Sequence, residues 1–190
     1  MIGSKITGNK YLDESILIAI SLALICYLGP VKLDFITEIP TTLQSLLVVW
    51  FALAFGLRIG MTAVFLYLIA GGLGLGVFAG GASGWNHLFG SNGGFLLAFP
   101  IGAFIAGSLV QILARIKFLS KAKFISSALI LFISQISILI LGLFWQSAFI
   151  GKTISITTIY SIFIPGLLIK TAIGTLVLVF ISRAKSQILS

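Results

Sequence analysis

The sequence predicts an all-α, polytopic integral membrane protein with six transmembrane helices. Apolar residues make up 59% of its 190 residues and charged residues only 8%, whereas about a quarter of a soluble domain is charged. Several apolar runs approach the roughly 20 residues that cross a bilayer. All four acidic residues, Asp13, Glu14, Asp34 and Glu38, lie in the first 38 positions. The later chain therefore lacks the intramembrane carboxylate typical of ion-driven pumps, and we expect one membrane domain over 1–190.

Pro, Gly and charged residues divide the chain into candidate spans. The six spans that result are 14–30, 42–57, 59–78, 94–114, 124–148 and 159–182. Only the short segment 56–60 separates the second span from the third, so we expect these two to form a tight antiparallel hairpin.

Basic residues predict the orientation of the chain in the membrane. With the amino terminus inside, the outer segments carry only Lys32 and Lys152. The inner segments carry Lys5, Lys10, Arg58, Arg115, Lys117, Lys121, Lys123, Arg183 and Lys185. This asymmetry predicts a multi-pass protein of the cell membrane with both termini in the cytoplasm. Because these charges lie between apolar spans, the net charge of +8 indicates contact with the lipid bilayer and no nucleic-acid partner.

Residues 71–94 hold ten glycines in 24 positions. Glycine adopts positive φ readily and is a poor helix former, and irregular backbone in a membrane must be covered by protein. We therefore expect a structured outer cap over the helices, with a floppy external loop as the alternative. Interleaved aromatic and amide side chains there suit a small ligand with an apolar body and a hydrogen-bonding head. The candidates are Phe78, Trp85, Asn86, Asn92 and Phe95.

Lys170 interrupts the last apolar span, at a cost of about 3 kcal/mol on insertion scales. Gly166, Lys170 and Gly174 are four residues apart, so they share one helix face. A ligand carboxylate is an attractive partner for the ammonium. The alternative is that Pro165 begins the helix and Lys170 snorkels to the headgroups.

Other polar residues are less informative. Gln44, at the start of the second span, is expected to bind either another helix or the ligand. Lone His87 and lone Cys26 predict no metal site. We expect no cofactor, because Gly151-Lys152-Thr153 lacks the rest of a phosphate loop. Hydrolytic enzymes need paired acids, a nucleophile with a base, or metal ligands, so we expect no enzyme activity.

Four segments in order resemble the BioY family of biotin-specific substrate-binding subunits of energy-coupling-factor transporters. They read I-P-T-T-L-Q at 39–44, V-F-A-G-G at 77–81, G-S-N-G-G-F at 90–95 and P-G-L-L-I-K at 165–170. The resemblance covers residues 15–182. It implies a six-helix protein that binds biotin from outside and delivers it inward. It also implies a transmembrane coupling subunit and two ABC ATPase subunits as partners.

The family pattern assigns further roles by resemblance. An A-x-x-x-A pair on the first helix packs against the coupling subunit, and Ala19 and Ala23 match it. The resemblance also implies that the bicyclic head of biotin is buried among aromatic side chains, with amides on the ureido group and Lys170 near a polar end. The aromatic side chains expected there are Tyr67, Phe78, Trp85 and Phe95.

One departure from the family pattern concerns the ligand directly. The family usually has P-G-D-x-x-K, with an Asp expected to help bind the ureido ring, where this chain has Leu167. The neutral candidates for that role are Gln44, Asn86 and Asn92. Biotin uptake is thus the leading hypothesis. The alternatives are a substrate-binding subunit for another vitamin such as thiamin or riboflavin, a solitary facilitator, and a simple channel.

Overall fold

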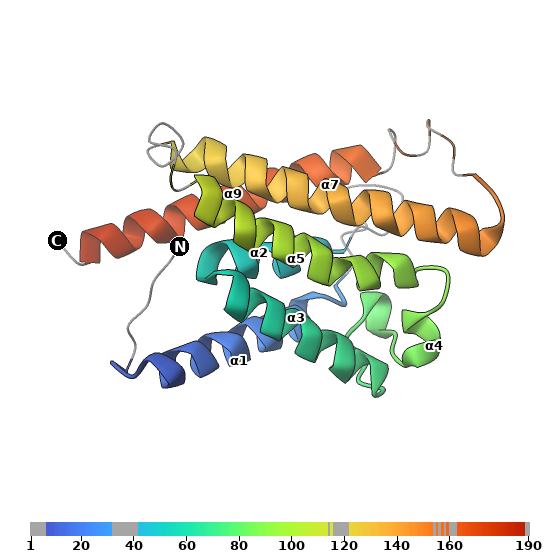
Figure 1. Ribbon diagram of the computed structural model, residues 1–190, viewed down its shortest axis with the longest axis horizontal. Coiled ribbons are helices and arrows are strands. Elements are labelled where there is room, and N and C mark those ends of the chain that lie inside the picture. Colours follow the sequence, from blue (N-terminus) through green and yellow to red (C-terminus); the bar gives the residue numbers. More distant parts are fainter. Residues whose placement is uncertain are drawn as a thin grey trace.

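A computed structural model describes residues 7–31, 42–113, 115, 122–153, 155, 157, 159 and 163–188. Within them the chain forms a bundle of helices (Figure 1). Its elements are α1 (Lys10–Leu28), α2 (Gln44–Phe55), α3 (Leu57–Gly72), η1 (Ala79–Gly81), α4 (Trp85–Leu88), α5 (Gly93–Leu113), α7 (Lys123–Ile150) and α9 (Ile164–Ile188). A helix of at least 12 residues thus lies at each of the six positions expected from the sequence.

Four of these helices, α1, α5, α7 and α9, are long and apolar enough to cross a membrane. Their outer faces carry large apolar side chains such as Phe104, Phe144, Leu176 and Phe180, which are more than half exposed. Such surfaces are costly in water and suit lipid. The chain is therefore a multi-pass membrane protein.

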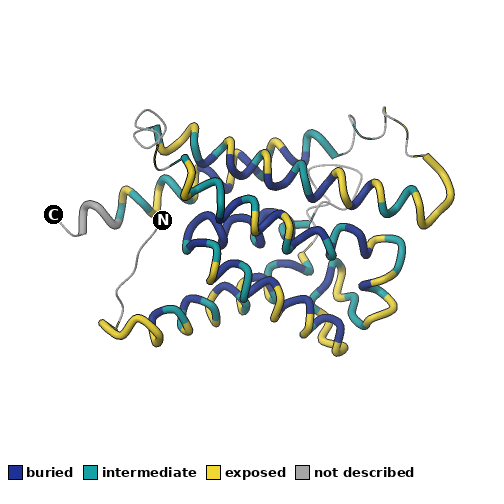
Figure 2. Tube along the Cα trace, in the orientation of Figure 1, coloured by how far each residue is buried: buried dark blue, intermediate teal, exposed yellow. Residues whose placement is uncertain are grey.

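Helices α2 and α3 are apolar but shorter, with 12 and 16 residues. At 1.5 Å per residue α2 is only about 18 Å long, less than the roughly 30 Å of a hydrocarbon core. It contacts α1, α3, α5, α7 and α9, and nine of its residues are buried. Figure 2 shows the buried stretches concentrated inside the bundle, with exposed residues along the outer sides. Helix α2 is thus the central element of the core.

The expected hairpin between the second and third spans turns at a single residue, Gly56, with φ of 101°. Gly60 then packs directly on Ala52, where a Cβ atom at position 60 would lie 2.4 Å from the Ala52 Cα. The two residues are each four positions from the turn, so the missing side chain lets the two helices lie in backbone contact.

Two expected boundaries were wrong. The third helix ends at Gly72 and not at 78, because the backbone turns through glycines, Gly74 having φ of 106°. The first helix begins at Lys10, since Asn9 caps it by accepting a hydrogen bond from the Tyr11 N–H at 3.0 Å. The last helix, expected from 159, is described from Ile164, and residues 160–162 before it lie outside the described residues.

The glycine-rich segment 73–92 folds into η1 and α4 beside the end of α3. The Gly84 N–H donates to the Gly71 carbonyl at 2.7 Å, and the Gly80 N–H donates to the Pro30 carbonyl at 3.1 Å. The Phe78 ring lies against Gly71 and the Trp85 ring against Gly72. We call residues 73–92 the cap; in Figure 1 it lies at the opposite end of the bundle from the start of α1 and the end of α9.

Candidate functional site

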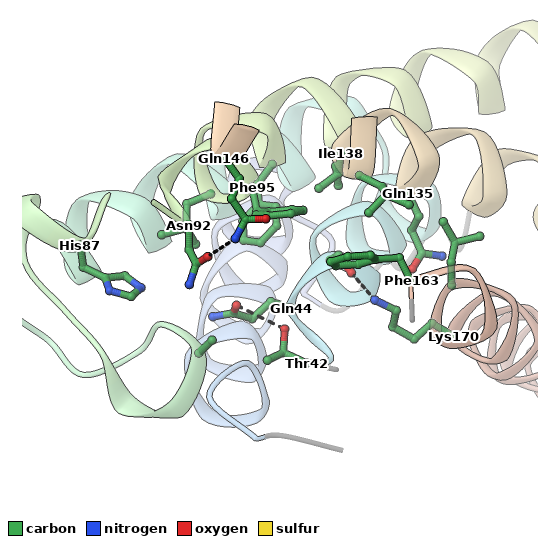
Figure 3. A pocket seen from close by; sticks show the side chains of 17 residues that line it. Thr42, Gln44, His87, Asn92, Phe95, Gln135, Ile138, Gln146, Phe163 and Lys170 are labelled. Carbon is green, nitrogen blue, oxygen red and sulfur yellow. Dashed lines mark hydrogen bonds between the residues drawn. The ribbon is translucent and has the colours of Figure 1, made fainter. Parts of the chain in front are cut away.

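A cavity of about 370 Å³ lies among α2, the cap, α5, α7 and α9, within the roughly 300–1,000 Å³ range of small-molecule sites. Figure 3 shows the side chains that face it. They are Thr42, Gln44, Ser45, Ala79, His87, Asn92, Phe95, Leu96, Phe99, Gln135, Ile138, Leu139, Gln146, Phe163, Gly166, Leu167 and Lys170. The cavity therefore combines apolar walls with a few polar groups.

Lys170 is the charged residue of this lining. Its Nζ donates a hydrogen bond to the Ser45 Oγ on α2 at 2.8 Å, so the side chain points into the bundle (Figure 3). The described hydrogen bonds and ion pairs give Lys170 this hydroxyl partner and no carboxylate. Asp34 and Glu38 lie outside the described residues. An ammonium with two further N–H donors thus faces the cavity.

The helix that carries Lys170 is held tightly against α2. The Trp50 Nε1 donates to the Gly174 carbonyl at 2.9 Å, and a Cβ atom at position 174 would lie 2.6 Å from Leu46. Gly174 thus brings the backbone of α9 close to α2, and Leu46 fills the space beside this glycine.

Gln44 lines the cavity but is only 3% exposed. Its Nε2 donates to the Tyr67 hydroxyl and to the Val77 carbonyl, the latter at 3.3 Å. The Tyr67 hydroxyl in turn donates to the same carbonyl at 3.1 Å. Gln44 therefore binds another helix and also faces the cavity, so that the two expectations for it are compatible. This network joins α2, α3 and the cap.

Gln135 on α7 is the second buried amide of the cavity wall, at 2% exposure. Its Nε2 donates to the Thr171 Oγ1 on α9 at 3.1 Å and to the Leu131 carbonyl at 3.3 Å. Its Oε1 is buried and has no hydrogen-bond partner within the described structure. An unpaired buried acceptor costs about 1–3 kcal/mol, so this atom is a strong candidate for contact with a ligand.

The apolar walls come chiefly from α5, α7 and α9. The Phe95 and Phe163 rings are nearly parallel, with centroids 6.3 Å apart and an interplanar angle of 17°. Leu167 is 3% exposed and packs with Leu139. Position 167 therefore contributes apolar surface to the cavity, where the family pattern has an acidic group.

Toward the cap, a second group of polar residues surrounds the cavity. The Gln146 Nε2 donates to the Asn92 Oδ1 at 3.2 Å, joining α7 to the cap. The Trp145 Nε1 donates to the Gly90 carbonyl at 3.0 Å and reinforces this junction. The His87 ring stacks on Phe78 at 5.7 Å. In Figure 3 His87, Asn92 and Gln146 lie away from Lys170 and Gln135, so the cavity has polar groups toward two ends.

The site residues expected from the sequence divide into two groups. Lys170, Gln44, Asn92 and Phe95 line the cavity. The other four lie outside its lining: they are Tyr67, Phe78, Trp85 and Asn86. Tyr67 and Phe78 are fully buried, and their rings meet edge to face at 5.6 Å. Tyr67 accepts a hydrogen bond from Gln44 and Phe78 stacks on His87, so both rings hold lining residues in place without facing the cavity.

Trp85 is 48% exposed and stacks on Phe89 at 6.4 Å, while Asn86 is also exposed. The start of the 39–44 segment, including Pro40 and Thr41, lies outside the described residues. No group of three or more possible metal ligands occurs in the described part of the chain.

Sequence reasoning missed several lining residues, notably Ser45, Gln135, Gln146 and Phe163. Gln135 offered one signal, as an amide in the middle of the long apolar run 124–148, where polar groups are usually functional or bonded to another helix. Ser45 and Phe163 offered none, because neither residue type is unusual beside a membrane span.

Comparisons with known proteins show which family the chain belongs to. The family model described as "BioY family" matches residues 5–187. The chain belongs to the BioY family. The "Probable biotin transporter BioY" of Pyrococcus horikoshii is 35% identical over 116 residues, 61% of this chain and 64% of that protein. "Biotin transporter BioY2" of Lactococcus lactis subsp. cremoris is 37% identical over 74% of this chain and 73% of that protein.

A crystal structure described as the S-component for biotin from an ECF-type ABC transporter has the same fold. It superposes with a TM-score of 0.76 at 23% identity and covers 94% of this chain and 95% of that one. The BioY membership predicted from the four segments is thus confirmed, and so is the helical membrane fold.

Proposed function

We propose that this BioY protein is the membrane-embedded substrate-binding subunit of an energy-coupling-factor transporter and that it binds biotin. The observation that carries the proposal is the cavity, whose apolar walls separate polar groups toward two ends. Biotin has the same pattern, with a ureido ring at one end, a carboxylate at the other and apolar atoms between. The relatives named as biotin transporters support this substrate.

Within the cavity, Lys170 supplies hydrogen-bond donors and positive charge to a polar end of biotin. Phe95 and Phe163 contact the apolar part, and Gln44 and Asn92 offer further amide groups. The cap, on the outer side of the membrane, covers the bound molecule. The described lining carries no acidic side chain, so it favours an anionic or neutral ligand over a cationic one such as thiamin.

Six membrane crossings with both termini in the cytoplasm fit the distribution of basic residues. In that orientation the turn at Gly56 and residue 115 lie on the inner side and the cap lies outside. Biotin then enters from the cap side. Energy for its inward release comes from two ABC ATPase subunits through the transmembrane coupling subunit.

Calorimetric titration of the purified protein in detergent tests the substrate. Biotin should bind saturably, with one molecule per chain, while thiamin and riboflavin should produce no binding heat at the same concentrations. Binding of either of these vitamins without binding of biotin would transfer the protein to the alternative of a different vitamin. Absence of binding for every vitamin tried would favour a channel.

A further inference from the structure

The orientation of the Gln135 amide is fixed by its nitrogen. The Nε2 donates to the Leu131 carbonyl at 3.3 Å and to the Thr171 Oγ1 at 3.1 Å. The Leu131 carbonyl can only accept a hydrogen bond. Rotating the amide by half a turn would therefore place the Gln135 Oε1 against the Leu131 carbonyl oxygen. The Oε1 atom therefore keeps its position on the other side of the amide.

This oxygen is a buried acceptor without a donor. Within the described structure it has no hydrogen-bond partner, although Gln135 is only 2% exposed. The residue forms part of the cavity wall, on the same side as Lys170 and Phe163 (Figure 3). Lys170 itself donates to Ser45. Buried polar atoms in folded proteins nearly always have a partner, so the missing donor is expected to come from the ligand.

We propose that the Gln135 Oε1 accepts a hydrogen bond from an N–H group of the bound ligand and thereby selects its head group. The identity of that ligand rests on the proposed function. In biotin the N–H groups belong to the ureido ring, whose carbonyl oxygen lies beside them. Lys170 donates to this oxygen while Gln135 accepts from the neighbouring N–H.

The opposite orientation of biotin, with its carboxylate beside Lys170 and Gln135, is disfavoured. A carboxylate is acceptor-only near neutral pH, so it would place an oxygen against the Gln135 Oε1 and leave that acceptor unpaired. The ureido ring is therefore assigned to the end of the cavity formed by Lys170 and Gln135, and the carboxylate to the end near Asn92 and Gln146.

The variant Gln135→Met tests the acceptor, because methionine has similar length and no strong hydrogen-bonding group. Biotin affinity should fall roughly ten-fold. The variant loses the unpaired oxygen and also the two hydrogen bonds of Nε2; because these changes act in opposite directions on stability, the melting temperature of the ligand-free protein should change little. The matched control is Ser134→Ala, which removes another buried side-chain oxygen that has no partner in the described structure, on the same helix but outside the cavity lining; its biotin affinity should stay within roughly three-fold of the wild type.

A chemical probe isolates the N–H group itself. Biotin methylated on the ureido nitrogens should bind the wild type more weakly than biotin does, and Gln135→Met should show a much smaller difference between the two ligands, as expected for groups in direct contact. Equal loss in both proteins would overturn the proposal. Unchanged biotin affinity in Gln135→Met would also overturn it, whatever the melting temperature of the variant.

A further experiment distinguishes a wrong substrate from a wrong role for Gln135. If the wild type binds no biotin, the fragment 2-imidazolidinone, a cyclic urea, still probes the acceptor by saturation-transfer NMR. Preference of the wild type, but not of Gln135→Met, for this fragment over its N,N′-dimethyl derivative would retain Gln135 as an N–H acceptor for a different ligand. No preference in either protein would reject it.

Discussion

Lys170 carries a partly buried charge whose partner in the described structure is a neutral hydroxyl. Its ammonium donates to the Ser45 hydroxyl at 2.8 Å, and a neutral hydroxyl does not neutralise a cation. In a membrane span such a residue is costly and usually functional. The same side chain should therefore oppose folding slightly and favour ligand binding.

The variant Lys170→Met separates these two effects. Biotin affinity should fall roughly ten- to a hundred-fold, since a hydrogen bond to a charged group contributes about 1.5–3 kcal/mol. The melting temperature without biotin should stay the same or rise, because a partly buried charge without an acidic partner in the described structure is gone. Calorimetry and thermal unfolding measure the two quantities. Unchanged affinity would assign Lys170 to a purely structural role.

Tyr67 supports the cavity without lining it. Its hydroxyl accepts from the Gln44 amide and donates to the Val77 carbonyl, in a region that is fully buried. Tyr67→Phe should lower the free energy of unfolding by about 1–3 kcal/mol and weaken biotin binding less than Lys170→Met does. The control Tyr27→Phe alters a tyrosine that is 79% exposed and should change neither quantity.

At the residue scale the sequence located part of the site. Lys170 was predictable because a lone cation in an apolar run is rare and costly. The orphaned oxygen of Gln135 was not predictable, because it depends on Thr171, which is 36 positions away on another helix. Aromatic residues of the cap were expected to contact the ligand, but Phe78 and Trp85 pack on glycines of α3.

At the scale of elements, the cap is held to the bundle by glycine contacts. A Cβ atom at Gly71 would lie 2.2 Å from the Phe78 ring, and that ring stacks on His87 in the cavity lining. The helix positions followed from apolar runs, whereas the helix ends did not, because caps and positive-φ glycines decide them. The early end of α2 also escaped prediction, since the expected span ran to 57 whereas the helix ends at Phe55, before Gly56 with φ of 101°.

The variant Gly71→Ala should displace Phe78 and, through it, the cap. Biotin should dissociate faster from this variant, with a destabilisation of about 1–3 kcal/mol, typical of overpacking. The double variant Gly71→Ala with Phe78→Leu makes room for the new methyl group and should recover part of the affinity. Stopped-flow or filter-binding measurements of dissociation would detect this, and an unaltered rate in Gly71→Ala would separate the cap from ligand retention.

At the scale of the whole molecule, α1 has a free face. Its buried residues Leu17, Ser21 and Ile25 recur every four positions, whereas Ala19 and Ala23 lie two positions further along and are exposed. Two residues correspond to about 200° around a helix, so this small-residue stripe faces away from the bundle. It is available for close packing with the coupling subunit that we propose as partner.

The variant Ala19→Trp should block biotin uptake by cells and leave binding by the purified protein intact, because the bulky side chain obstructs only that outer face. Leu176→Trp, at a position 60% exposed on α9, is the matched control and should transport normally. Transport of labelled biotin at the wild-type rate by Ala19→Trp would remove α1 as the coupling surface.

A structure determined with biotin bound would show whether the cavity beside Lys170 holds the substrate. We predict density for one biotin molecule enclosed by α2, α7, α9 and the cap, with its ureido ring against Lys170 and Gln135. Biotin located elsewhere on the protein, with this cavity empty, would contradict it.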